Sequence, residues 1–379
     1  MNNSHEALEE HRKLRGKIKI ELKEPLENPE QLGLYYTPGV AAVSSLLASH
    51  PGETHNYTWT NNNVAIISDG SAVLGLGNIG PNGALPVMEG KSMLFKHFAG
   101  IDAVPIVLDV HSIDEIVAAV KAIAPSFGGI NLEDIAAPQC FEIERRLVEE
   151  LTIPVMHDDQ HGTAIVVLAG LINAARLRSQ SLKESKIVIV GAGAAGIAIA
   201  KLLHTYAAPN IIMVDSKGII GKSRTDLNST KIDLLEFTNP NTITGDLSDA
   251  LEDADIFIGV SQPGLLTKEL IQTMAKDPVI FAMANPIPEI MPDEAKVAGA
   301  FIVATGRSDF PNQVNNALAF PGIFKGALDN RIRRIDTDHK IAAAEAIAGL
   351  VDEPTVDKII PSIFDKRLVP AISALFKEL

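Results

Sequence analysis

The chain has 379 residues, enough for two or three domains, and its 46% hydrophobic and 21% charged residues are typical of a globular protein with packed cores. Its formal net charge of −14 repels phosphate backbones and anionic membrane surfaces, so we expect binding neither to nucleic acid nor to membranes. The same charge repels an anionic substrate, which a bound cation or local basic groups would have to offset.

Two further features bear on location and redox chemistry. Residues 1–17 contain no apolar stretch like that of a secretory signal, and the uncharged stretch 187–200 is too short to span a bilayer. The single cysteine, Cys140, excludes an internal disulfide framework, and its surroundings favour a small buried side chain. We therefore expect a cytoplasmic protein without structural disulfides.

Short apolar runs alternate with amphipathic stretches over residues 1–161. Their patterns predict strands over residues 64–68, 103–108 and 151–157 and a helix over residues 112–124. The third strand leads directly into the polar segment HDDQHG, which ends at Gly162. We therefore expect an N-terminal α/β domain over residues 1–161.

A second series of strands and helices follows from Gly162. Apolar runs predict strands over residues 186–190, 211–214, 256–260, 279–283 and 301–304. Because strands that alternate with helices form parallel sheets, residues 162–330 are expected to form a doubly wound, Rossmann-type domain. Residues 331–379 look helical, and we expect them to pack back onto the first domain. The predicted fold class is therefore α/β with two domains.

A glycine-rich turn, GAGAAG, follows the first strand of the second domain and opens a helix. In such a turn the first glycine permits the sharp bend, the second lets backbone amides approach a pyrophosphate, and the third allows close helix–sheet packing. The helix N-terminus then holds the phosphates. A sheet of this kind can also bind another nucleotide or nothing. We expect dinucleotide contacts from Gly191, Ala192, Gly193, Ala194, Ala195 and Gly196.

Asp215 ends the next predicted strand, where an acidic side chain accepts hydrogen bonds from the adenosine ribose hydroxyls and repels a 2′-phosphate. This position favours NAD over NADP. A basic segment just beyond it could instead pair with the phosphate through Lys217, Lys222 and Arg224, so NADP stays possible. Asn285 follows a later strand and is expected at the same ligand crevice, unless it only caps a turn.

Two acidic pairs also follow short apolar segments: Glu133-Asp134 and Asp158-Asp159. Carboxylates that lie together raise one another's pKa unless a cation neutralises them, and ligation by oxygen alone favours Mg²⁺ or Mn²⁺. The histidines that flank the second pair are expected to pack against the site or to hydrogen-bond its ligands. Ordinary loop acids and helix caps would give the same pattern, so these residues alone leave a metal site open.

Further segments join these motifs in a single order along the chain. They are Leu34–Ala41, Asp69-Gly70, Leu74–Gly80, Glu89–Lys91, Asn131–Asp134 and Asp158–Ala164, followed by Gly191–Gly196, Ala284–Pro286 and Asn312–Asn316. In this order they resemble the serial signatures of malic enzymes over residues 30–325. The length of the chain is similar to that of the short bacterial form, without an appended domain.

The resemblance implies a role for each matching residue. Tyr36 aligns with the family's general acid, Lys91 with its general base, and Asp158 with the carboxylate that partners the lysine. The implied ligands of Mg²⁺ or Mn²⁺ are Glu133, Asp134 and Asp159, and the implied cofactor- and substrate-contacting asparagines are Asn285 and Asn315. Without the family pattern, Lys91 would be expected as a solvated surface lysine and Tyr36 as a half-buried packing residue.

One departure from the family concerns the carboxylates of the substrate. Longer malic enzymes carry an arginine before the LGLG segment, whereas this chain has Ser71, Ala72 and Val73 there. The remaining candidates are the Ser71 hydroxyl, backbone amides near Gly75 and the two asparagines, and the sequence does not rank them. The effector sites of the longer enzymes are not implied.

The resemblance implies oxidative decarboxylation of (S)-malate to pyruvate and CO₂ with reduction of NAD(P)⁺, by a homodimer. With its pKa lowered by the metal, Lys91 would take the proton of the C2 hydroxyl, and Tyr36 would protonate the enolate carbon. A malolactic or oxaloacetate decarboxylase-type enzyme without net cofactor reduction stays open. An amino-acid dehydrogenase would not need two acidic pairs, and a non-catalytic dinucleotide-sensing module would need neither Lys91 nor Tyr36.

Overall fold

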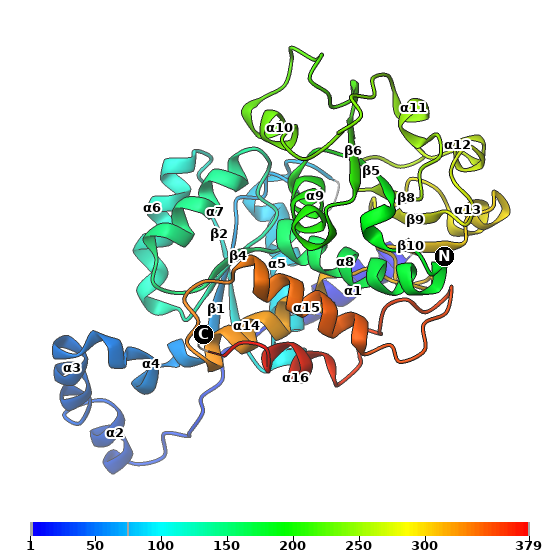
Figure 1. Ribbon diagram of the computed structural model, residues 1–379. Helices are drawn as coiled ribbons and strands as arrows, with labels where there is room; N and C mark the ends of the chain where they lie inside the picture. Colours follow the sequence, from blue (N-terminus) through cyan, green and yellow to red (C-terminus); the bar gives the residue numbers. More distant parts are fainter. Residues whose placement is uncertain (1–2, 74–75, 378–379) are drawn as a thin grey trace.

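The computed structural model describes residues 3–73 and 76–377 and contains two β-sheets, each layered with helices (Figure 1). The first sheet has four strands and the second has six among the described residues. This arrangement confirms the predicted α/β class with an N-terminal unit and a Rossmann-type unit. Within the described part of the chain, no helix is long and apolar enough to cross a membrane.

The first sheet consists of β1 (Asn63–Ser68), β2 (Asp102–Val107), β3 (Ile130–Leu132) and β4 (Val155–His157). Its strands are all parallel, in the spatial order β2-β1-β3-β4. β1 is buried on both faces: Ile66 belongs to the core beneath α5 (Gly80–Ala99), and Ile67 belongs to the core beneath α6 (Ile113–Ile123) and α7 (Gln139–Glu150). A central strand covered by helices on both sides is therefore apolar without alternation.

The second sheet is the expected doubly wound sheet. Its strands are β5 (Lys186–Val190), β6 (Asn210–Asp215), β7 (Gly218–Ile219), β8 (Ile256–Gly259), β9 (Val279–Ala282) and β10 (Ile302–Thr305). Their spatial order is β10-β9-β8-β5-β6-β7, and only the β6–β7 pair is antiparallel. The sequence predicts every strand here except β7, whose two residues are too few to show a period.

Helix α8 (Asp158–Arg178) connects the two sheets. It begins directly after β4 and is buried along most of its length, so it has no polar face. It packs against α9 (Ala194–Ala207), and one apolar core runs through it from β1 to β5. The expected domain boundary between residues 161 and 162 therefore falls inside a continuous helix.

The C-terminal helices pack against this shared core. α14 (Phe320–Asp329) lies on α5, where Phe320 and Phe324 contact Phe95. α15 (Thr337–Gly349) packs on α8 and α9, and α16 (Leu368–Ser373) packs on α14 and α15. Residues 350–367 form no helix, so the segment expected to be helical is only partly so.

The remaining described helices are short or lie at the periphery. They are α1 (Asn3–Leu14), α2 (Pro29–Tyr35), α3 (Val40–Ser49), α4 (Thr54–Tyr57), α10 (Ser229–Leu234), α11 (Leu247–Leu251), α12 (Lys268–Gln272) and α13 (Pro292–Val297). Single 3₁₀ turns cover η1 (Pro51–Glu53), η2 (Trp59–Asn61), η3 (Ala124–Ser126), η4 (Leu182–Glu184) and η5 (Asn316–Leu318).

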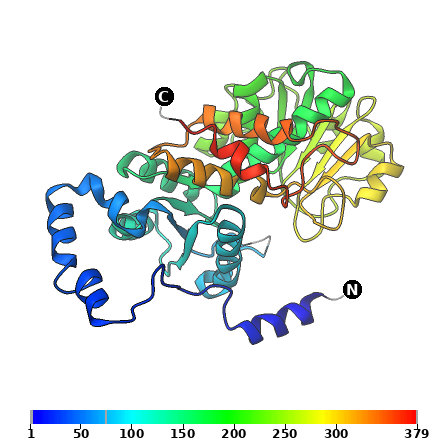
Figure 2. The same ribbon diagram turned by 90° about the horizontal axis from the view of Figure 1, so that it is seen from below.

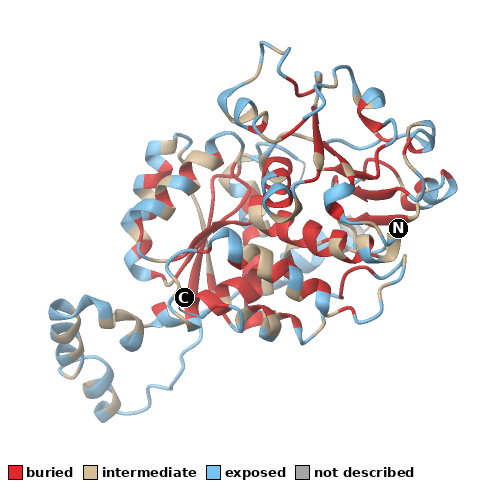
Figure 3. Ribbon diagram, in the orientation of Figure 1, coloured by how far each residue is buried: buried red, intermediate tan, exposed pale blue. Residues whose placement is uncertain are grey.

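Residues 18–58, which we call the arm, extend away from the two layered units. Both ribbon views show α2 and α3 apart from the sheets (Figures 1 and 2). No residue of the arm is buried, and Figure 3 shows it almost entirely as exposed or intermediate surface. Several large apolar side chains lie on it, including Leu34, Tyr35 and Tyr36. The arm therefore does not contribute to the cores described above.

Candidate active site

Acidic residues gather where the strands of the first sheet end. Glu133 and Asp134 follow β3, Asp158 and Asp159 follow β4, and Asp69 follows β1. Since β1, β3 and β4 are parallel neighbours, their carboxyl ends share one edge of the sheet. The structure thus places both predicted acidic pairs side by side.

Lys91 reaches this edge from α5. Its side chain is only 8% exposed, and its ammonium donates hydrogen bonds to Glu133 Oε1 at 2.9 Å and to Asp158 Oδ2. The same ammonium lies 4.0 Å from the ring centroid of Phe320. Burial lowers the pKa of Lys91, but attraction to Asp158 and Glu133 outweighs it, so the pKa lies above its ordinary value. The solvated lysine expected without the family pattern is therefore wrong.

The negative charge around Glu133 is greater than the single positive charge of Lys91 can neutralise. Burial raises its pKa, Lys91 lowers it, and the carboxylates of Asp159, Asp158 and Asp134 raise it again, so that it lies well above the ordinary value. Asn131 Nδ2 donates a hydrogen bond to Glu133 Oε2 at 2.9 Å. Asp158 is fully buried, and its Oδ1 has no hydrogen-bond partner in the described part of the chain.

The acidic group has the donor chemistry of a hard cation site. Carboxylate oxygens are what Mg²⁺ and Mn²⁺ prefer, and a cation would relieve the repulsion around Glu133. Across residues 3–73 and 76–377, however, no three His, Cys, Asp or Glu side chains converge as metal ligands. Asp159 Oδ2 instead accepts the Asp134 backbone N–H at 2.7 Å. The residues fit the cation in charge and donor type.

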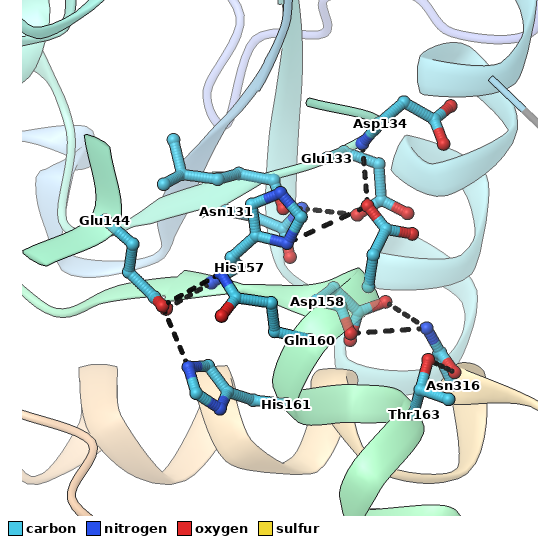
Figure 4. Close-up of polar contacts among 12 residues, drawn as sticks. Asn131, Glu133, Asp134, Glu144, His157, Asp158, Gln160, His161, Thr163 and Asn316 are labelled. Carbon is cyan, nitrogen blue, oxygen red and sulfur yellow. Dashed lines mark hydrogen bonds and ion pairs between the residues drawn. The ribbon is translucent and has the colours of Figure 1, made fainter. Parts of the chain in front are cut away.

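Glu144, on α7, has a role that the sequence does not reveal. Its carboxylate accepts hydrogen bonds from the His157 backbone N–H at 2.8 Å, from Gln160 Nε2 at 3.2 Å and from His161 Nε2 at 2.9 Å (Figure 4). Burial raises the pKa of Glu144, but attraction to His161 outweighs burial and lowers the pKa to about 2. Glu144 therefore fixes the turn that delivers the acidic pair after β4.

Two neighbouring asparagines contact the site differently. Asn316 Nδ2 donates to Asp158 Oδ2 at 3.2 Å, and Asn316 Oδ1 accepts from the Thr163 hydroxyl at 3.1 Å (Figure 4). Asn315 Oδ1 accepts the Ala317 N–H at 2.8 Å and so caps η5. The asparagine that reaches the acidic cluster is therefore Asn316, whereas the sequence singles out Asn315.

Ser71 is already engaged within its own loop. Its hydroxyl donates to Asp69 Oδ1 at 2.6 Å and accepts the Ala136 N–H at 2.9 Å. Gly70 has φ +72, and a Cβ there would lie 2.2 Å from the Gly80 carbonyl oxygen, so only glycine lets this loop approach α5. The expected backbone amides near Gly75, like the Leu74-Gly75 part of the motif, lie outside the described residues.

Tyr36 is not brought to Lys91 within this chain. It caps the C-terminus of α2 in the arm and is 67% exposed. Figures 1 and 2 show α2 far from α5, which carries Lys91. The half-buried packing residue expected without the family pattern is wrong. The proposed general acid and general base thus lie in separate regions.

The glycine-rich turn occupies the carboxyl edge of the second sheet between β5 and α9. Gly191 has φ +112, and a Cβ there would lie 2.7 Å from the Val260 carbonyl oxygen. A Cβ on Gly196 would lie 1.8 Å from the Gly191 oxygen, whereas one on Gly193 would face open space. In a dinucleotide-binding turn the first glycine permits the bend, the third allows close packing and the second leaves room for the pyrophosphate. Gly191, Gly196 and Gly193 meet these three requirements in turn. Asn285 is exposed three residues beyond the end of β9, directly after the buried Ala284.

Asp215 ends β6 as the sequence predicts, but its carboxylate is already paired. Arg224 Nη1 lies 2.7 Å from Oδ1, and Lys231 Nζ lies 2.5 Å from Oδ2. Burial raises the pKa of Asp215, but hydrogen bonds from Arg224 and Lys231 lower it below its ordinary value. The Lys217 ammonium pairs instead with Asp226 at 2.9 Å. Lys231 is a contact that the sequence analysis misses.

The fold and the two edges together define a class of protein. A doubly wound sheet with a dinucleotide-type glycine turn, beside a buried lysine among carboxylates, is the arrangement of a dinucleotide-dependent oxidoreductase. A family model of the malic enzyme N-terminal domain matches residues 15–148, and one of the malic enzyme NAD binding domain matches residues 160–374. The chain belongs to the malic enzyme family.

Similar proteins agree with this assignment. The chain is 56% identical to the bifunctional malic/malolactic enzyme of Bacillus subtilis, covering 98% of this chain and 92% of that protein. It is 54% identical to the NAD-dependent malic enzyme of Geobacillus stearothermophilus, covering 94% and 75%. The crystal structure of NAD-dependent malic enzyme from Thermotoga maritima has a TM-score of 0.95 at 52% identity, covering 98% of both chains.

Proposed function

We propose that the chain oxidises (S)-malate with NAD(P)⁺ and releases pyruvate and CO₂ in a metal-dependent reaction. The observation that carries this proposal is Lys91, a buried cation held between Glu133 and Asp158 at the carboxyl edge of the first sheet. The test is the absorbance of reduced nicotinamide after malate, Mn²⁺ and dinucleotide are mixed with the purified chain. Malate-dependent reduction is expected, and none with either dinucleotide would contradict the proposal.

Lys91 would serve as the general base toward the C2 hydroxyl. In contact with two carboxylates its pKa is raised, so it must lose a proton before it can accept one. A positive charge bound to Glu133 would weaken that carboxylate's attraction for Lys91 and would lower the pKa. Asp158 would keep the amine in position, and Asn316 would in turn hold Asp158.

Glu133, Asp134 and Asp159 would hold Mg²⁺ or Mn²⁺. Their oxygen donors and the raised pKa of Glu133 support this assignment, and Asp158 Oδ1, unpartnered within the described residues, adds negative charge to the same cluster. When bound, the cation would polarise the oxygens of the 2-keto acid and stabilise the enolate left by CO₂. The chain's own acids would orient that cation toward the substrate beside Lys91.

The metal assignment is tested by removing and restoring the ion. A chelator should abolish dinucleotide reduction, and Mn²⁺ or Mg²⁺ should restore it. Glu133→Gln should also weaken Mn²⁺ binding measured directly by electron paramagnetic resonance, whereas Glu142→Gln, which changes an exposed acid of α7, should not. Full activity in chelator, or restoration by Zn²⁺ alone, would show that the assignment is wrong.

Tyr36 would act as the general acid in the site of a second copy of the chain. Its exposure on the arm, beside Leu34 and Tyr35, is what an interface rather than a free surface would have. A twofold homodimer would place each arm on the other protomer and each Tyr36 near the other Lys91. The tyrosine would then protonate the enolate carbon after decarboxylation.

Mixing two inactive variants tests this shared site. Lys91→Ala and Tyr36→Phe protomers that are unfolded and refolded together should regain about a quarter of the parent activity. About half of the dimers are then mixed, and one of the two sites in each mixed dimer combines both intact residues. Each variant refolded alone is the control. No recovery, although mixed dimers form, would show that Tyr36 acts within its own chain or not at all.

Loops of both sheets would hold the ends of the substrate, and loops of the second sheet would hold the cofactor. Asn285 and Asn315 remain the proposed contacts, although Asn315 would have to release its cap of η5. Ser71 would contribute only if it released Asp69. The turn Gly191–Gly196 would bind the pyrophosphate, and Asp215 would favour NAD⁺. The relatives include proteins named as NAD-dependent and as NADP-dependent malic enzymes, so both cofactors should be tested.

A malolactic reaction is the second candidate, since the Bacillus subtilis relative is named a bifunctional malic/malolactic enzyme. In that reaction the hydride taken from malate returns to pyruvate, so lactate and CO₂ form without net reduction of the dinucleotide. Chromatography of the products separates the two outcomes. Lactate formed with a catalytic amount of NAD⁺ would show the malolactic reaction, whereas pyruvate in step with NADH would show oxidative decarboxylation alone.

A further inference from the structure

Glu289 is a buried acid outside the catalytic cluster. It follows β9 and is 0% exposed, and across the described ranges only burial and backbone hydrogen bonds, with no basic side chain, act on its carboxylate. Its Oε1 accepts the Ser261 backbone N–H at 3.1 Å, and its Oε2 accepts the Ala284 backbone N–H at 3.0 Å. One carboxylate therefore bridges the segments that follow β8 and β9.

The backbone around Glu289 joins the same two segments. The Leu266 N–H donates to the Glu289 carbonyl at 3.1 Å, and the Gly264 N–H donates to the Pro288 carbonyl at 3.3 Å. The loop after β8 is thus fastened along its length to the loop after β9. Burial raises the pKa of Glu289, and a buried carboxylate is costly unless its oxygens accept hydrogen bonds. The two bonds to its oxygens and the two backbone bonds beside them therefore form a specific arrangement.

Gly259, the last residue of β8, leaves the space that the carboxylate fills. A Cβ at this position would lie 2.4 Å from Glu289 Cδ, well inside contact distance. The φ of Gly259 is not in the left-handed region, so backbone conformation does not require glycine here. Its lack of a side chain is therefore explained by Glu289.

These segments border the dinucleotide turn. Val260, between Gly259 and Ser261, lies beside the turn: its carbonyl oxygen and Cγ2 would lie 2.7 Å and 3.2 Å from a Cβ on Gly191, and its Cγ2 would lie 3.3 Å from a Cβ on Gly196. Asn285 directly follows Ala284, whose N–H Glu289 accepts. Glu289 thus connects the segment that carries Val260 with the segment that carries Asn285, at the edge where ligands bind in such sheets.

We propose that Glu289 is a positioning residue for the dinucleotide: its carboxylate holds the loops after β8 and β9 in the arrangement that binds the cofactor. The inference rests on the proposed function only for the identity of the cofactor. A carboxylate is required because both of its oxygens accept an N–H, whereas a glutamine would turn its own N–H₂ toward one of these donors.

The test is direct titration of the protein with NADH, followed by fluorescence, without malate or metal. Glu289→Gln should weaken NADH binding about tenfold, as expected when one buried donor loses its acceptor. Gly259→Ala, which pushes on the same carboxylate, should weaken NADH binding similarly, and the double variant should be no weaker than either. Glu294→Gln, an exposed acid on nearby α13, is the control and should bind as the parent does.

Steady-state kinetics separate positioning from loss of folded protein. The KM for the dinucleotide should rise while the KM for malate and the Mn²⁺ requirement stay unchanged. NADH binding within twofold of the parent in Glu289→Gln would overturn the proposal, even if the variant melts earlier. If Glu289→Gln does not fold, unchanged NADH binding in Gly259→Ala overturns it. Because NADH binding is measured without substrate, an absence of malate oxidation would contradict the proposed function and leave this inference standing.

Discussion

The residues proposed as general base and general acid lie in two regions built in opposite ways. Lys91 lies among the end of β3 and the first residues of α8 and α14. It touches two carboxylates and a phenylalanine ring and is 8% exposed. Tyr36 lies on an arm without a single buried residue and is 67% exposed. The surroundings of the proposed base, Lys91, are therefore complete within one chain. The surroundings of the proposed acid, Tyr36, depend on what covers the arm.

A proposed catalytic group can be positioned by contacts within its own chain, as Lys91 is, or by contacts with a second chain, as we propose for Tyr36. In the packed region, Glu144 and Asn316 orient the acids that surround Lys91, so the geometry is set when the chain folds. The arm has no such support, and its apolar side chains would be costly to leave in water. Oligomerisation would therefore be part of the catalytic site rather than an addition to a complete one.

The largest expected effect comes from the packed region. Lys91→Ala should lower turnover by about 10³- to 10⁴-fold, because it removes the proposed base and leaves two buried carboxylates without their cation. Steady-state assays with circular dichroism would separate catalysis from unfolding. Lys96→Ala is the matched control, since Lys96 lies on the same helix, is 60% exposed and pairs with Asp102. Near-parent turnover in Lys91→Ala would contradict the assignment.

The next effect tests the arm. Tyr36→Phe should lower the overall reaction at least about 100-fold, the scale of a lost general acid, while oxidation of malate and decarboxylation of added oxaloacetate suffer less. Partial reactions measured by nicotinamide absorbance and by CO₂ release make the comparison. Tyr35→Phe is the control, because the neighbouring tyrosine is 54% exposed on the same arm. Equal losses in both variants would indicate a structural rather than a catalytic effect.

Much of the packed region could be predicted because parallel strands bring their carboxyl ends together. The placements of Glu133, Asp158 and the glycine turn follow from short apolar runs and the residues after them. Glu144 could not be found this way, because on α7 it is one acid among several in an amphipathic helix. Its role depends on the tertiary contact with β4, which local sequence does not encode.

The asparagines and the arm show the same limit. Asn315 and Asn316 are equivalent in sequence, and only the path of η5 decides that one caps the turn and the other reaches Asp158. The family pattern named Tyr36, but neither periodicity nor composition predicts that α2 stands away from the sheets (Figure 2). Contacts between elements distant in sequence therefore account for what the sequence missed.

The free energy of unfolding tests whether contacts within the chain, such as those of Glu144, fix the geometry of the packed region. The pKa of Glu144 is lowered from 4.5 to about 2, chiefly by His161 against the opposing effect of burial. Its ionised form therefore stabilises the fold above about pH 4.5, and this contribution is lost as the pH falls toward 2. Burial lowers the pKa of His161 below its ordinary value, so the imidazole is neutral at pH 7 and the hydrogen bonds to Glu144 carry the stabilisation there. Glu144→Gln should cost about 1–3 kcal/mol at pH 7.

Urea unfolding at several pH values between 3.5 and 8 would measure this cost. The difference between parent and Glu144→Gln should shrink below about pH 4.5, and above it should fall only by the share that is lost when His161 becomes neutral. Glu149→Gln, which changes a 55%-exposed acid on the same helix, should show a difference near zero throughout. A penalty that is the same at pH 3.5 and pH 7 would mean that the charge of Glu144 is not what holds the turn.

The smallest expected effect is on the choice of cofactor at Asp215. The side chains around Asp215 are more exposed than Lys91 and less exposed than Tyr36. Like the acids around Lys91, Asp215 is paired in advance, but Arg224 and Lys231 are 15% and 24% exposed, so solvent weakens their hold. Asp215 favours NAD⁺ by repelling a 2′-phosphate, whereas the two cations reduce that repulsion and would attract the phosphate. We therefore expect a modest preference for NAD⁺ in the parent chain.

Removing one cation should widen that preference. Lys231→Ala frees one oxygen of Asp215 for the ribose hydroxyls and deletes a cation near the 2′ position, so the ratio of kcat/KM for NAD⁺ to that for NADP⁺ should rise by about 10-fold at most. Lys217→Ala is the control, because the Lys217 ammonium pairs with Asp226 and should leave the ratio unchanged. A parent that favours NADP⁺ tenfold or more, with that preference lost in Lys217→Ala, would instead assign the choice of cofactor to the basic segment after β6.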